Sequence, residues 1–162
     1  MTAKVYLDTN VFIRAFEGSD ALSQALVDLL AIDVPEPAFA TSELTLAELL
    51  VHPYRNGDDT GRQRYDNLVR PSAWLHVGPV DRQVLTGAAV LRSKHRLKLP
   101  DAIHISTALH FGCELLITGD GGLDGSFSLE HQSSGQSWTG KAVRTVGLML
   151  DTVRATAEQL RA

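Results

Sequence analysis

Short apolar runs along the chain alternate with longer segments in which apolar residues recur at helical spacing. The apolar runs predict strands at residues 4–7, 39–42, 74–77, 113–118 and 145–150. The helical spacing predicts helices at 10–16, 20–32, 44–53, within 55–70, at 81–97, at 100–111 and from 151 onward. Strands that alternate with helices in this way indicate a three-layer α/β/α fold with a mainly parallel central sheet.

Capping residues and helix breakers set the expected ends of several elements. Asn10 is expected to cap the first helix, and Ser19 or Asp20 to cap the second. The third helix is expected to end near Pro53, because proline lacks the backbone N–H that a helix interior needs. Residues 125–144 are rich in Gly and Ser and have few apolar anchors, which predicts a long loop there.

The composition fits one domain of ordinary size. With 162 residues, 44% hydrophobic and 21% charged, the chain is long enough for one well-buried core and short for two, so we expect a single domain over residues 1–162. No stretch is long and apolar enough to span a bilayer, and the N-terminal apolar run is too short for a signal peptide. Cys113 is the only cysteine, which excludes an intramolecular disulfide. These features are typical of a cytoplasmic protein.

Charge is distributed unevenly along the chain. The net charge is −4, yet between Arg55 and Lys98 there are nine Lys or Arg and only four Asp or Glu. Such a basic segment suits a polyanion, although single cations are commonly solvated side chains on helix faces. Cations are most frequent at the C-terminal end of the helix predicted at 81–97, where the helix dipole favours positive charge. Four of them are candidates to bind phosphate groups: Arg92, Lys94, Arg96 and Lys98.

Four acids lie at the ends of the most apolar segments or within them. They are Asp8 in VYLDTNVF, Glu48 in LTLAELLV, Asp101 in LKLPDAIHI and Asp120 in LLITGDGGL. A carboxylate beside a buried strand or on the inner face of a helix costs several kcal/mol of desolvation unless its charge is offset. Oxygen ligands from scattered carboxylates suit Mg²⁺ or Mn²⁺, and the sequence offers no comparable set of Cys and His for zinc or copper.

Two of these acids are expected to meet at one edge of the sheet. Asp8 and Asp120 each follow a predicted strand, and ligands of parallel α/β sheets bind outside the carboxyl ends of the strands. Glu48 lies on an apolar helix. Asp101 lies at a helix start and does not follow a strand, so strand-end geometry does not itself place Asp101 beside the others. The helix dipole alone is an alternative reason for an acid at Asp101.

Hydrolysis of a phosphodiester gives such acids a reason to cluster. The reaction needs an activated water and neutralised phosphoryl oxygens, which one or two Mg²⁺ ions about 3.5 to 4 Å apart supply. Without a cation, clustered acids repel one another and raise their own pKa values. The pattern therefore favours a metal-dependent phosphoryl-transfer enzyme.

The four motifs, in this order, resemble the PIN-domain ribonucleases, and among them the VapC-type toxins of toxin–antitoxin modules. The resemblance extends from Lys4 to about Leu123. It implies a Mg²⁺- or Mn²⁺-dependent endoribonuclease of the cytoplasm that acts on RNA, is held by a cognate antitoxin and forms a homodimer. The residues that carry over are the metal-binding acids Asp8, Glu48, Asp101 and Asp120, with Asn10 and Thr118 as polar neighbours that orient a carboxylate or water.

Departures from the family pattern leave two residues with open roles. Relatives usually have an aromatic residue at the position of Leu123, and a further acid, Asp124, follows it, so Asp124 is a possible fifth metal ligand. His104 shares a helix face with Asp101, which could bring its imidazole close to the metal. A partly buried histidine that hydrogen bonds to its neighbours is the alternative.

Two other functions are compatible with parts of the pattern. A haloacid-dehalogenase-like phosphatase also begins with a strand and an aspartate, but it needs a second aspartate where this chain has Asn10. A non-catalytic PIN-like binding protein would keep the fold without the reaction. The presence of all four acids disfavours that alternative.

Overall fold

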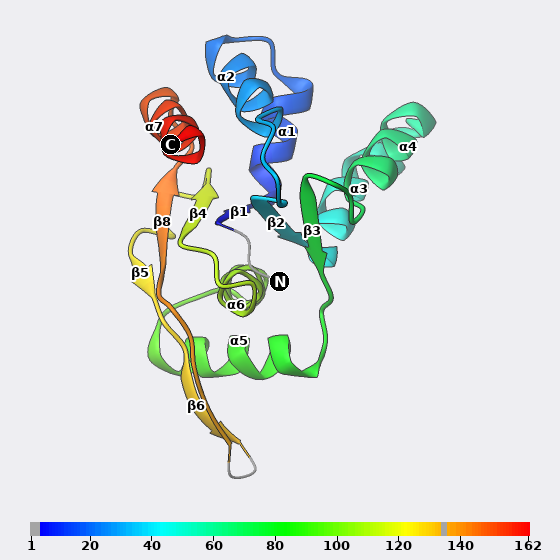
Figure 1. Ribbon diagram of the computed structural model, residues 1–162. Coiled ribbons are helices and arrows are strands. Elements are labelled where there is room, and N and C mark those ends of the chain that lie inside the picture. Colours follow the sequence, from blue (N-terminus) through cyan, green and yellow to red (C-terminus); the bar gives the residue numbers. More distant parts are fainter. Residues whose placement is uncertain (1–3, 134–135) are drawn as a thin grey trace.

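Six strands form the central sheet of the computed structural model, in the order β3-β2-β1-β4-β8-β5 (Figure 1). Neighbouring strands are parallel except for β5, which runs antiparallel to β8. The structure describes residues 4–133 and 136–162. The strands are β1 (Val5–Leu7), β2 (Phe39–Ser42), β3 (Leu75–Gly78), β4 (Leu115–Thr118), β5 (Ser126–Phe127) and β8 (Val143–Gly147).

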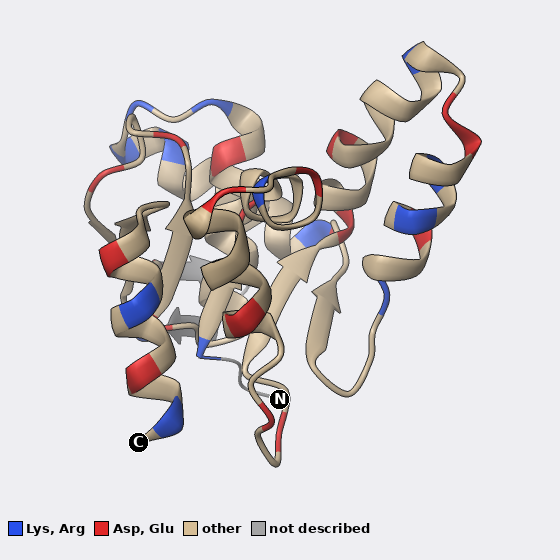
Figure 2. Cartoon of the chain, turned by 90° about the horizontal axis from the view of Figure 1, so that it is seen from above, with Lys and Arg blue, Asp and Glu red and all other residues tan. Residues whose placement is uncertain are grey.

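Helices cover both faces of the sheet, which confirms the predicted three-layer α/β/α fold (Figure 1). One face packs against α1 (Thr9–Glu17), α2 (Ala21–Leu30) and α7 (Leu150–Arg161), and the other against α5 (Arg82–Lys94) and α6 (Leu99–His110). A helical hairpin of α3 (Glu43–Asn56) and α4 (Asp59–Leu68) projects from the side of the domain (Figures 1 and 2). Among the described helices, none is both long and apolar enough to cross a membrane.

Side chains of each strand alternate between the two cores. Val5 and Leu7 of β1 belong to the core beneath α1, α2 and α7, whereas Tyr6 between them belongs to the core beneath α5 and α6. Leu116 of β4 lies in the same core as Tyr6. Because of this alternation, the hydroxyl-bearing ring of Tyr6 faces the helix that carries Asp101.

Several helix ends differ from the prediction, among them the start of α1 and the end of α3. Asp8, not Asn10, caps α1, because its Oδ1 accepts the backbone N–H of Thr9 at 2.8 Å. Helix α3 continues past Pro53 to Asn56 and ends at Gly57, which adopts the left-handed conformation (φ 63°). A proline therefore removes one helical hydrogen bond there without ending the helix.

The C-terminal third holds more strand structure than the sequence predicts. The expected loop at 125–144 contains β5 and a two-stranded hairpin of β6 (Glu130–Ser133) and β7 (Gln136–Thr139), which extends beyond α5 (Figure 1). The final strand is β8, two residues earlier than predicted. Phe127, Leu129 and Val143 are each at most 6% exposed and anchor this region. Three buried side chains and backbone pairing hold a segment whose pattern is otherwise polar.

Candidate metal-binding site

The site lies where the direction of strand succession changes in the sheet. The chain passes from β1 to β2 on one side, while β4 pairs with β1 on the other side, with Leu7 opposite Ile117. The helices that follow β1 and those that precede β4 lie on opposite faces. In α/β sheets such a switch point leaves a crevice at the carboxyl ends of the strands. Asp8 and Asp120 follow these two strand ends.

Asp8 is held by hydrogen bonds to both carboxylate oxygens. It is 7% exposed; Oδ1 accepts the N–H of Thr9, and Oδ2 accepts the hydroxyl of Thr118 at 2.7 Å. The same Thr118 oxygen accepts the backbone N–H of Asp120 at 3.0 Å. Thr118 therefore links the ends of β1 and β4, in agreement with its predicted place beside the acids.

Glu48 reaches the same place from α3. Its Oε1 accepts the hydroxyl of Thr9 at 3.0 Å and lies 2.6 Å from Nε2 of His104. Burial raises the pKa of Glu48, but the hydrogen bond and charge of His104, together with the Thr9 hydroxyl, lower it below the ordinary value. Glu48 and Asp8 thus contact the same two partners, since Nε2 of His104 also lies 3.6 Å from Oδ1 of Asp8.

In the described part of the chain, the side chains of Asp101 and Asp120 have fewer hydrogen-bond partners than those of Asp8 and Glu48. Asp101 lies in the first turn of α6, and Oδ1 of Asp120 accepts the N–H of Gly122 at 2.9 Å. Burial raises the pKa of Asp101, and the nearby carboxylates of Asp120 and Asp8 raise it further. Within the described residues, neither Asp101 nor Asp120 forms an ion pair.

The structure brings all four predicted acids to one edge of the sheet. Hydrogen bonds through Thr9 connect Asp8 with Glu48, and His104 hydrogen bonds to Glu48 and lies 3.6 Å from Asp8. Charge repulsion acts between Asp101 and the carboxylates of Asp120 and Asp8. Carboxylate oxygens that raise one another's proton affinity are a donor set that fits a hard divalent cation. Within the described ranges, no three His, Cys, Asp or Glu side chains are already arranged around one metal position.

The other predicted site residues are placed less closely. Asn10 is exposed in the first turn of α1, and Asp124 is exposed before β5. For neither residue does the structure give a hydrogen bond or ion pair to the four acids among the residues it describes. Asn10 as an orienting group and Asp124 as a fifth ligand stay predictions.

Two residues in the hydrogen-bond network were not among the sequence candidates. Thr9 bridges Asp8 and Glu48, and the hydroxyl of Tyr6 lies 2.7 Å from Nδ1 of His104. A tyrosine inside a short buried strand was the available signal, since a buried phenol usually finds a polar partner. His104 itself agrees with the alternative of a buried histidine that hydrogen bonds to its neighbours, since it is 2% exposed and contacts Glu48.

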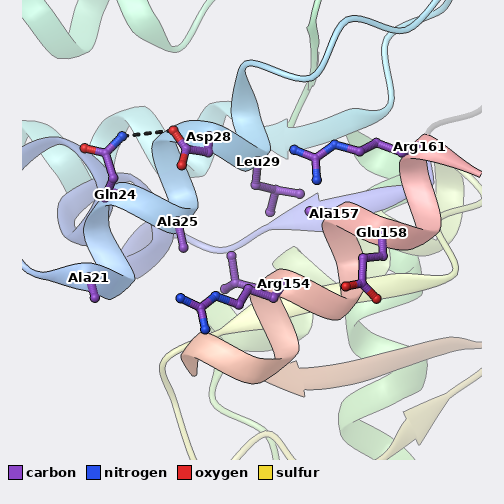
Figure 3. A pocket seen from close by; sticks show the side chains of 10 residues that line it. Ala21, Gln24, Ala25, Asp28, Leu29, Arg154, Ala157, Glu158 and Arg161 are labelled. Carbon is purple, nitrogen blue, oxygen red and sulfur yellow. Dashed lines mark hydrogen bonds between the residues drawn. The ribbon is translucent and has the colours of Figure 1, made fainter.

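Two surface hollows differ in position. A groove of about 490 Å³ is lined in part by Asn10 and Gly119, which lie close in sequence to Asp8 and Asp120. A second hollow of about 350 Å³ lies between α2 and α7 (Figure 3), and none of the four acids lines either hollow. Acidic and basic bands alternate along α7, the helix that ends at the C label in Figure 2. The hollow at α7 therefore lacks the one-sided charge of the acid site.

The comparisons with known proteins place the chain in a family. The sequence profile of the PIN domain matches residues 5–125, most of the chain, and the chain therefore belongs to the PIN domain family. No curated protein matches the sequence. The haloacid-dehalogenase-like alternative is set aside, because PIN membership accounts for the strand-end aspartate without a second one.

Solved structures of VapC-type toxins share this fold. A toxin–antitoxin complex from Klebsiella pneumoniae is 26% identical, with 72% of this chain and 87% of that chain covered and a TM-score of 0.55. VapC20 of Mycobacterium tuberculosis, a toxin that cleaves the sarcin–ricin loop, is 20% identical over 73% of this chain and 91% of its own, with a TM-score of 0.58. DNA-bound VapBC of Salmonella typhimurium is 16% identical over 91% and 100%, with a TM-score of 0.54. These likenesses show that the chain shares the fold of these proteins.

Proposed function

We propose that this protein is a Mg²⁺- or Mn²⁺-dependent endoribonuclease and the toxin of a toxin–antitoxin module. The observation that carries the proposal is the convergence of four carboxylates at the switch point of the sheet, where Asp120 and Asp8 raise the pKa of Asp101. The family and the named activity of VapC20 support RNA as the substrate.

All four acids take part in the proposed cation site. Asp8, Asp101, Asp120 and Glu48 are the proposed ligands, and a divalent cation, when bound, supplies the charge that activates water and neutralises phosphoryl oxygens. Thr118 and Thr9 orient the Asp8 carboxylate, and Thr9 also orients Glu48. Asn10, exposed beside the groove, is the proposed contact to water or substrate at its near end.

The loop before α6 is the proposed RNA-binding segment. Four exposed cations lie between the last turn of α5 and the start of α6: Arg92, Lys94, Arg96 and Lys98. Lys98 immediately precedes α6, and its charge acts on Asp101 three residues later. A phosphate chain bound along this loop would therefore reach the acids. Cations at the C-terminal end of α5 also interact favourably with its dipole.

An antitoxin and a second copy of the chain are the proposed protein partners. Structural neighbours named as toxin–antitoxin complexes support the first of these. Two exposed apolar residues on the projecting α3 helix, Val51 at 45% and Tyr54 at 63%, offer contact surface for a partner.

RNA cleavage in the presence and absence of metal tests the proposal. Purified protein should cleave labelled RNA with Mg²⁺ or Mn²⁺ and not in excess chelator. Asp8→Asn, which keeps a helix-capping side chain, should lower the rate by at least about 100-fold. Asp28→Asn makes the same charge change on α2 and should cleave as the wild type does. Cleavage that survives the chelator, or full activity of Asp8→Asn, contradicts the proposal, and metal binding without cleavage supports the non-catalytic alternative.

A further inference from the structure

A chain of hydrogen bonds runs from the core of the domain to the acid site. It begins at Tyr6 in β1, which is fully buried, and passes through His104 in α6, which is 2% exposed. The phenol oxygen lies 2.7 Å from Nδ1, and Nε2 on the other side of the ring lies 2.6 Å from Oε1 of Glu48. The two rings meet edge to face, with centroids 5.8 Å apart. His104 is thus held on both nitrogens, by one core residue and one site residue.

The partners of the ring indicate where its proton lies. The Glu48 carboxylate only accepts hydrogen bonds, so Nε2 must carry the proton that it shares with Oε1. The Tyr6 hydroxyl contacts the other ring nitrogen, Nδ1, so the ring is fixed between the two partners with Nε2–H directed at Glu48.

The hydrogen bonds from His104 and Thr9 restrain one oxygen of the Glu48 carboxylate. The Nε2–H of His104 and the hydroxyl of Thr9 both reach Oε1 of Glu48. Among the described interactions, none engages the second oxygen, Oε2. A glutamate has three side-chain torsions to restrain, and two hydrogen bonds to one oxygen fix its direction while leaving the other oxygen open to a ligand.

We propose that Tyr6 and His104 are a positioning pair, in which the phenol fixes the orientation of the imidazole and the imidazole holds Glu48 ready for a divalent cation. The inference deepens the proposed function and rests on it. His104 acts through Glu48 and does not itself hold the metal.

Imidazole ¹⁵N NMR of the metal-free protein tests the pair independently of nuclease activity. In the wild type, Nε2 of His104 should carry a proton that is hydrogen bonded to Glu48. Tyr6→Phe removes only the phenol oxygen and should change the His104 ring signals, because the ring loses its partner at Nδ1. Tyr65→Phe, in a buried tyrosine of α4, is the matched control and should leave the His104 signals unchanged. A wild-type ring without a proton on Nε2, or His104 signals that are the same in Tyr6→Phe as in the wild type, overturns the proposal.

Metal affinity and kinetics test what the pair does. His104→Ala should weaken Mn²⁺ binding by about 10- to 100-fold and lower kcat for RNA with little change in KM, because Glu48 then loses its donor. His104→Gln keeps a donor in a comparable position and should recover much of the affinity. Tyr6→Phe should show a smaller loss than His104→Ala, and Tyr65→Phe none. Wild-type Mn²⁺ affinity in folded His104→Ala and Tyr6→Phe overturns the positioning role.

The two proposals fail in different ways. If the wild type binds Mn²⁺ but cleaves no RNA, the nuclease proposal fails, while the His104 ring signals and the Mn²⁺ affinities still decide the role of the pair. If RNA is cleaved with metal but the variants bind Mn²⁺ as the wild type does, the nuclease stands and the pair is refuted.

Discussion

The two halves of the acid site are built in opposite ways. Asp8 and Glu48 are held by hydrogen bonds from Thr9, Thr118 and His104, whose effect on Glu48 is a lowered pKa. Among the residues that the structure describes, no side chain donates such a bond to Asp101, and its pKa is raised by burial and by its acidic neighbours. The protein itself stabilises the negative charges of Asp8 and Glu48, which we call the hydrogen-bonded half. The charges of Asp101 and Asp120, the repulsive half, would be neutralised by a bound cation.

The difference separates acids that stabilise the fold from acids that only the proposed metal binding requires. A carboxylate that caps a helix and ties two strands contributes to stability whether or not metal is present. Carboxylates that repel one another lower stability until a cation binds, as binding sites commonly do. Substitutions in the two halves should therefore affect stability in opposite directions.

The largest expected effect is the loss of RNA cleavage when Asp101 or Asp120, the repulsive half of the site, is substituted. Asp101→Asn and Asp120→Asn should each lower metal-dependent RNA cleavage by at least about 100-fold, because each removes a proposed ligand. The metal-free variants should be no less stable than the wild type, since repulsion is relieved. Cleavage assays and denaturant unfolding in chelator measure both. A strongly destabilised Asp101→Asn would refute the division into halves.

The next largest effect is on stability in the hydrogen-bonded half. Asp8→Ala should lower the free energy of unfolding of the metal-free protein by about 1 to 3 kcal/mol, since it removes the cap of α1 and the acceptor of the Thr118 hydroxyl. Asp120→Ala should cost less than about 1 kcal/mol. Urea unfolding in chelator compares the two, and equal losses would contradict the account.

A smaller effect is expected from the threonine that orients Asp8. Thr118→Val keeps the shape of the side chain and removes the hydroxyl, which should weaken Mn²⁺ binding by about five-fold, the equivalent of one neutral hydrogen bond. Thr107→Val, whose buried hydroxyl bonds within α6 to the Ile103 carbonyl, is the control. Calorimetry should show unchanged Mn²⁺ affinity for the control, and an equal loss in both variants would point to a general packing effect.

The smallest effect is a pH dependence of opposite sign in the metal-free protein. The lowered pKa of Glu48 contributes stability that is present above its ordinary value of 4.5 and is lost as pH falls through the folded-state value. The raised pKa of Asp101 makes ionisation costly above the folded-state value, and this cost disappears as pH falls below the ordinary 3.8. The stability deficit of Glu48→Gln should therefore shrink in acid, while any gain of Asp101→Asn should grow toward neutral pH. Unfolding series from pH 3 to pH 7 would reveal parallel slopes if the account is wrong.

The sequence predicts the first half of the domain better than the last. The strand at Phe39–Ser42 lies where the pattern places it, because an apolar run between breakers leaves few alternatives. The hairpin of β6 and β7 was missed, since backbone pairing needs no apolar periodicity. Boundaries such as Asp8 for Asn10 depend on which side chain reaches a free N–H, which a pattern does not encode.

The four acids could be predicted from the sequence, but most of the residues that hydrogen bond to them could not. Asp8 and Asp120 follow apolar strands, so the sequence alone places them at one edge. Tyr6 and His104 are 98 residues apart in sequence, and their contact follows from the packing of α6 on β1. Local patterns identify charged groups in costly places, but only the tertiary structure shows which of them already have partners.

Calorimetric titration of the metal-free protein with Mn²⁺ tests the central claim most directly. The wild type and Asp28→Asn should bind Mn²⁺ with dissociation constants below about 1 mM, while folded protein carrying both Asp101→Asn and Asp120→Asn should not. No binding by the folded wild type at several millimolar Mn²⁺, or unchanged binding by the double variant, would contradict the claim that these acids form a divalent-metal site.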